Sequence, residues 1–135
     1  MYTGLLHAHS GLRYLVILAG IVALLYALYG VVTRRDYDKP MRITATAFAG
    51  LLHLQVLLGF ILLVSADRFG THLIGHMGLM LAAAAAVQIP LSVFRRRAPE
   101  QRTFLPHLVT IVLAMLLIWL GIRTMGIGLF ETRGF

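Results

Sequence analysis

Histidine is the residue type best suited to chemistry in this 135-residue chain, which contains six histidines and no cysteine. Without cysteine the chain forms no disulfide, thiolate zinc site, iron–sulfur cluster or covalent c-type haem attachment, so any metal chemistry falls to histidine, methionine or the backbone. An imidazole nitrogen binds iron strongly, and the uncharged ring is tolerated in an apolar environment. The six candidates are His7, His9, His53, His72, His76 and His107.

Four long apolar stretches contain or flank these histidines. Apolar residues make up 59% of the chain, more than a soluble protein of this size can bury. Each stretch has about 22 residues, which gives a helix of about 33 Å that crosses a bilayer once. Short loops make consecutive helices antiparallel. We therefore predict an all-α fold with a single domain over residues 1–135, an up-down-up-down bundle of four transmembrane helices at residues 11–32, 43–64, 72–94 and 104–125.

Basic residues are concentrated in two of the three predicted loops, and the chain has a formal net charge of +7. Cytoplasmic loops of membrane proteins are enriched in lysine and arginine, so the first and third loops are predicted to be cytoplasmic. Both termini then lie on the outer side of the cell inner membrane, which faces the periplasm. This topology explains the basicity, and nucleic-acid binding is not predicted. The basic residues are Arg34, Arg35, Lys39 and Arg42 in the first loop and Arg95, Arg96, Arg97 and Arg102 in the third.

Two arginines lie inside predicted spans, which contain no Asp or Glu to neutralise them. Arg13 follows His9 by four residues and therefore shares its helix face, while Arg123 lies near the outer end of the fourth span. A cation within the membrane is costly, and a bound anion would offset this cost. The two propionates of a haem are suitable anions, so Arg13 and Arg123 are candidate cofactor-binding residues.

The sequence therefore predicts one haem b in the outer half of the bundle, ligated by two neutral imidazoles from different helices. Axial ligands must lie at similar depth on facing helices. This favours His76 paired with His53 if the third helix starts early, or His76 paired with His9 if the first helix extends toward Thr3. A haem of this kind would make the chain a metal-binding protein of electron transport.

The remaining histidines lie nearer the two membrane surfaces. His7 and His72 are predicted at the outer surface, close enough to the haem to be candidate cofactor-binding residues. His72 and His76 are four residues apart and share one helix face. His107 alone belongs to the cytoplasmic half, where a hydrogen bond to a neighbouring group is the expected role.

Three segments together resemble small four-helix bacterial membrane proteins labelled cytochrome-b-like. They are residues 6–14 (LHAHSGLRY), 53–59 (HLQVLLG) and 76–80 (HMGLM), and the resemblance covers nearly the whole chain. It implies haem b binding and electron transfer, with His9, His53 and His76 at the matching positions. A dihaem cytochrome b would need a second histidine pair in the inner half, where only His107 lies, so a complete transmembrane electron pathway is not predicted.

The predicted function is that of an electron carrier, or of a haem-bearing subunit of a respiratory or photosynthetic complex, rather than of a stand-alone enzyme. Short loops leave little surface for a substrate pocket outside the membrane. The expected partners are the lipid bilayer, other membrane subunits or a second copy of the chain, and quinone or a periplasmic redox protein.

Two alternatives remain open at this level. In the first, the chain is an accessory or assembly subunit of a membrane complex, and its histidines are structural. In the second, it handles copper, because the thioethers of Met1, Met77 and Met80 together with His7 and His9 would make a soft outer-side site. A channel or proton-coupled transporter is disfavoured, since the spans lack carboxylates.

Overall fold

The computed structural model describes residues 2–65 and 71–123. Within these residues the chain is all-helical, as predicted. It forms α1 (Tyr2–Val32), α2 (Lys39–Ser65), α3 (Thr71–Arg95), a short 3₁₀-helix η1 (Pro99–Gln101) and α4 (Leu105–Arg123). The first three predicted spans lie within α1, α2 and α3, and the fourth begins one residue before α4 and ends outside the described residues. Helix α1 begins nine residues before its span, and α2 begins four before. Hydropathy marks only the apolar part of a helix, and α1 continues through its polar first turns.

All four α-helices of the described chain are long and apolar enough to cross a membrane. Their outward faces carry large apolar side chains such as Leu18, Leu25 and Val64, which are 57%, 59% and 65% exposed. A water-soluble protein seldom exposes so many, so these faces are suited to contact with lipid chains. The fold is that of a multi-pass membrane protein in a lipid bilayer.

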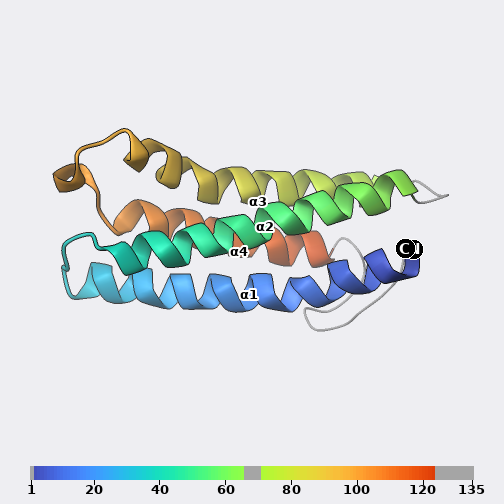
Figure 1. The fold of residues 1–135 in the computed structure, drawn as a ribbon, viewed down its shortest axis with the longest axis horizontal. Helices are drawn as coiled ribbons and strands as arrows, with labels where there is room; N and C mark the ends of the chain where they lie inside the picture. The colour runs from blue at the N-terminus through green and yellow to red at the C-terminus, as the bar shows by residue number, and fades with distance from the viewer. Residues whose placement is uncertain (1, 66–70, 124–135) are drawn as a thin grey trace.

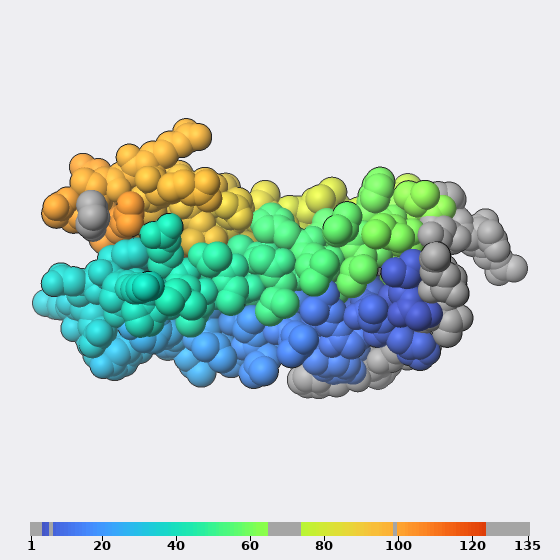
Figure 2. Space-filling model, in the orientation of Figure 1, coloured from blue at the N-terminus to red at the C-terminus, as the bar shows by residue number. Residues whose placement is uncertain are grey.

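Consecutive helices run in opposite directions along the long axis (Figure 1). The main contacts join α1 to α2 and α4, and join α3 to the same two helices. Helices α1 and α3 therefore occupy one diagonal of the bundle, and α2 and α4 occupy the other. We call the end where α1 and α3 begin the histidine end. The other is the basic end, where the α3–α4 connection lies beside the start of α2 (Figure 2).

Small residues allow the helices to pack closely. Ala23 and Ala27 of α1, Ala83 of α3 and Ala114 of α4 are all completely buried. Close approach of backbones is the usual basis of helix association in membranes, where lipid competes for apolar contacts. The closest approach involves Gly30 of α1, because a Cβ atom placed there would lie only 2.3–2.5 Å from the ring of Phe104.

The contact between Gly30 and Phe104 generates the first prediction. Gly30→Ala forces the buried Phe104 ring to move, which we expect to destabilise the protein by about 1–3 kcal/mol. The measurement is the thermal unfolding midpoint of the detergent-solubilised protein. Gly11→Ala is the matched control in the same helix, because a Cβ atom there meets nothing within 4 Å. Equal midpoints for the two variants would contradict the packing described here.

Candidate functional site

His9 lies in the first turns of α1 and packs against α2. A Cβ atom placed at Gly59 would lie 3.1 Å from Cε1 and 3.7 Å from Nε2 of His9, so the imidazole covers this glycine. The side chain of Gln55, one turn before Gly59, donates from Nε2 to the backbone carbonyl of His9 at 2.8 Å. Nδ1 of His9 and Oε1 of Gln55 are buried and have no hydrogen-bond partner in the structure. Unused hydrogen-bonding capacity is therefore concentrated where α1 meets α2.

His76 lies in the second turn of α3 and is oriented by α4. Its Nδ1 is 2.7 Å from the backbone carbonyl oxygen of Gly121. A carbonyl oxygen only accepts, so Nδ1 carries the proton and the neutral ring keeps its lone pair on Nε2. Histidines that ligate metals are commonly held in this way, by a hydrogen bond from the other ring nitrogen to a carbonyl. His76 thus has the tautomer that a metal-ligating histidine needs, and a hydrogen bond from its other ring nitrogen holds the ring in place.

The two imidazoles come from the diagonally placed helices α1 and α3 and lie at one level of the bundle, because His9 covers Gly59 together with Met77, the chain neighbour of His76. The other two helices contribute glycine at this level, Gly59 from α2 and Gly121 from α4. We call these four residues the histidine site. Two methionines fill the space beside them, since Cβ atoms at the glycines would lie 3.6 Å from Cε of Met77 and 2.4 Å from Cε of Met80.

The two arginines predicted to bind cofactor occupy different environments. Arg13 is 9% exposed and lies one turn from His9 along α1, where its charge interacts with that histidine. Its Nη2 donates to the hydroxyl of Tyr14 at 3.0 Å, and the guanidinium lies 4.9 Å from the centre of the Tyr14 ring. Arg123 is exposed and lies 5.4 Å from the ring centre of Trp119. Arg13 is therefore the cation close to the histidine site.

His53 does not lie at the histidine site. It is exposed on α2, where its Nε2 donates to Oε1 of Gln88 at 3.0 Å. Gln88 follows His76 by twelve residues on α3, which is about 18 Å along the helix. The structure therefore does not bring His53 and His76 together within one chain, and of the two predicted pairings it brings together only His9 and His76. From the sequence alone His53 and His76 could share a similar depth in the membrane, whereas they lie at different levels along the bundle.

Of the two surface histidines, the structure describes the side chain of His7 alone. The side chain of His7 is exposed on α1. The side chain of His72 and the whole of Met1 lie outside the described residues. No three His, Asp or Glu side chains of the described chain converge as potential metal ligands. A bis-histidine haem site requires only two imidazoles.

His107 is buried in an aromatic cluster at the basic end. Its Nε2 and the hydroxyl of Tyr37 form a hydrogen bond of 2.9 Å, and the two rings stack at 5.5 Å between centres. Phe94 packs edge-on against both rings. This hydrogen-bonded packing is the role expected for His107.

Asp38 caps the start of α2 beside this cluster. Its Oδ1 accepts the backbone N–H of Met41 at 3.1 Å, while Oδ2 accepts from the hydroxyl of Tyr26 and from Nη2 of Arg35 at 3.2 Å. Partial burial acts to raise the pKa of Asp38, but these hydrogen bonds outweigh it and hold the pKa below its usual value. The burial of Tyr37 raises the pKa of its phenol.

No family model, no curated protein and no solved structure matches this chain. Its function is therefore inferred from the site itself.

Two glycines of the histidine site and the neighbouring Gln55 were not predicted from the sequence. Gln55 donates to the carbonyl of His9. Gly59 and Gly121 resemble any other small residue in a membrane helix. The available signal was the spacing of Gln55 and Gly59, which are four residues apart and so share one helix face.

The capping role of Asp38 generates the second prediction. Because its pKa is lowered by folding, its stabilisation is complete above the unfolded value of about 3.9 and is lost as the pH falls through the lower folded value. We expect the thermal midpoint in detergent to decline from about pH 5 downward, and Asp38→Asn to flatten part of that decline. Asp36→Asn, at an exposed site in the same connection, should leave the profile unchanged. Identical profiles for wild type and Asp38→Asn would disprove the assignment.

Proposed function

We propose that this chain is a membrane electron-transfer protein, or a haem-bearing subunit of a larger complex, that holds one haem b between His9 and His76. The observation that carries the proposal is that His9 and His76, from diagonal helices, lie at one level of the bundle, where both remaining helices contribute glycine. The chain would then be similar in function to the cytochrome-b-like proteins that its sequence resembles.

The residues present fit a haem in several respects. Two neutral imidazoles are the donor set of a low-spin haem b, and the hydrogen bond from Nδ1 of His76 leaves its Nε2 available. His9 has a buried ring nitrogen without a partner. Side chains at Gly59 and Gly121 would occupy the space beside the imidazoles. Met77 and Met80 fill that space with flexible thioether chains, which can move aside more readily than aromatic rings.

The surrounding residues would orient and tune such a ligand. The carbonyl of Gly121 would fix the His76 ring and increase its basicity as a ligand. The buried charge of Arg13, one turn from His9, would lie within reach of a propionate and favour its ionised form. A bound haem would supply one-electron redox chemistry, and the apolar bundle would exclude water from it.

The same proposal includes an orientation in the inner membrane. With the basic loops in the cytoplasm, the histidine site and both termini belong to the outer side. Electrons would pass between the quinone pool or a partner subunit and an outer-side redox protein. A second copy of the chain or other membrane subunits would complete the assembly.

Visible spectra of the gently purified protein, oxidised and reduced with dithionite, test the proposal directly. We expect a sharp reduced α-band and a pyridine haemochrome of haem b at close to one haem per chain. His9→Ala and His76→Ala should each abolish or shift this spectrum. His7→Ala and His53→Ala are the matched controls, because these exposed histidines lie on the same helices as His9 and Gly59, and they should retain it.

Two outcomes would overturn the proposal. A colourless protein, expressed with adequate haem supply, would favour an accessory or assembly subunit with structural histidines. A spectrum that survives His9→Ala and His76→Ala but is lost in His53→Ala would move the haem to another pair of ligands. A folded His76→Gln variant keeps the test decisive if the alanine variant does not fold.

Copper handling is a second candidate, favoured by the position of the two methionines. Met77 and His9 both contact Gly59, and Met80 and His76 both contact Gly121, so thioethers and imidazoles lie at one level. Thioether and imidazole together suit Cu(I). Copper that copurifies with a colourless protein and is lost in Met77→Leu and Met80→Leu would establish this alternative in place of haem.

A further inference from the structure

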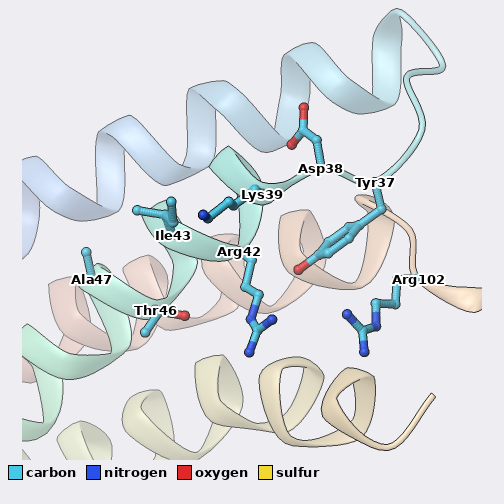
Figure 3. A pocket seen from close by; sticks show the side chains of 8 residues that line it. All are labelled: Tyr37, Asp38, Lys39, Arg42, Ile43, Thr46, Ala47 and Arg102. Carbon is cyan, nitrogen blue, oxygen red and sulfur yellow. The ribbon is translucent and has the colours of Figure 1, made fainter. Parts of the chain in front are cut away.

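A groove of about 710 Å³ opens at the basic end of the bundle, remote from the histidine site. It is lined by the first turns of α2, by Tyr37 and Asp38 just before that helix, and by Arg102 of the α3–α4 connection (Figure 3). We call it the interfacial groove, because it lies where α2 enters its apolar span. Nothing in the proposed electron-transfer function uses it.

Cations from separate elements gather around one end of this groove. Arg42 of α2 and Arg102 of the connection extend their guanidinium groups on either side of Tyr37 (Figure 3), and both charges interact with the phenol. Lys39 adds an ammonium from the start of α2. A small adjoining cleft is lined by Arg42, Arg102 and also Arg95 at the end of α3. Three arginines from three elements therefore border one small volume.

The described chain does not neutralise these groups. Asp38 is the carboxylate in the lining of the groove, but it is engaged by Arg35 at 3.2 Å and by the hydroxyl of Tyr26. Arg102 donates from Nη2 to the carbonyl of Arg97 at 3.0 Å, whereas its Nε is buried without a hydrogen-bond partner. A buried donor without an acceptor is costly, and an anion in the groove would satisfy it.

The rest of the groove is apolar and continues along the outside of the bundle. Ile43, which is 54% exposed, and Ala47 form its wall on α2. A second recess of about 260 Å³ shares Arg42 and Thr46 with the groove, but it is also lined by His53, Gln88 and Arg95 and is therefore partly polar. The groove thus has a cationic end and an apolar wall on α2.

We propose that the interfacial groove binds an anionic phospholipid, with its phosphodiester between Arg42 and Arg102 and an acyl chain along Ile43 and Ala47. Guanidinium groups bind phosphate oxygens through paired hydrogen bonds, and basic pockets between transmembrane helices are suited to anionic lipid headgroups. A free phosphate has no part that would cover the apolar wall, so the lipid is the better fit to the whole groove.

Native mass spectrometry of the full chain in detergent tests this inference. Phosphatidylglycerol and phosphatidylcholine with the same acyl chains are titrated separately, and inorganic phosphate is added as a competitor. We expect one phosphatidylglycerol to bind in preference to phosphatidylcholine. Arg42→Gln and Arg102→Gln should each weaken that binding about fivefold. Arg96→Gln is the matched control, because it removes the same charge from an exposed position at the basic end outside the groove.

Several results would overturn the inference. Equal binding of the two lipids would show that the headgroup charge is not recognised. If Arg96→Gln weakens phosphatidylglycerol binding as much as Arg42→Gln does, the binding depends on the net charge of the protein and not on the groove. Displacement of the lipid by inorganic phosphate would make the site one for soluble anions. If Arg102→Gln does not fold, the exposed Arg42 decides the test, since its replacement removes no buried contact.

Discussion

Few polar side chains enter the apolar part of the bundle, and the arrangement of the helices depends on the hydrogen bonds that these side chains form inside the protein. Water is absent from the centre of a bilayer, so an unsatisfied polar group is expensive there. Most of the histidine and glutamine side chains within the described bundle accordingly bond from one segment to another. The pairs are Gln55 with the His9 carbonyl, His76 with the Gly121 carbonyl, His53 with Gln88, and His107 with Tyr37.

These bonds join different pairs of segments. The first links α1 to α2, the second α3 to α4, the third α2 to α3, and the fourth α4 to the α1–α2 connection. Each interhelical hydrogen bond of this kind contributes about 0.6–2 kcal/mol in membrane proteins. The buried alanines determine how closely the helices approach. The hydrogen bonds determine which helix faces meet. Register and rotation of the helices thus depend on a few polar side chains.

The two ends of the bundle are filled by different kinds of side chain. At the basic end, rings of Tyr26, Tyr37, Phe94, Phe104 and His107 pack against one another, and Phe104 lies directly over Gly30. At the histidine end, the glycines are covered by an imidazole and by methionine chains. Aromatic rings are rigid, whereas methionine adapts its shape. The end that we propose to accept a cofactor is therefore the end that can rearrange to do so.

The sequence was sufficient to predict the helices, their lengths to within a few residues at most ends, and the hydrogen-bonding role of His107. Length and hydropathy determine these features directly. The pairing of histidines was left between His53 and His9, because residue counts along a helix give depth but not which neighbour a face meets. That choice depends on Gln55 and Gly59, whose contacts with His9 join residues that are far apart in the chain. Residues of the interfacial groove were recognised only as signals of topology.

The bond between His76 and Gly121 also bears on the order of events during biosynthesis. His9 emerges with the first helix and His76 with the third, but the carbonyl that sets the proton on His76 belongs to the last. A nascent chain with three inserted helices would carry both imidazoles, with the His76 ring free to rotate and to exchange tautomers. If the site binds haem as we propose, the His76 ring would be held in its ligating tautomer only after α4 has packed, so the haem would be bound after the fourth helix is in place.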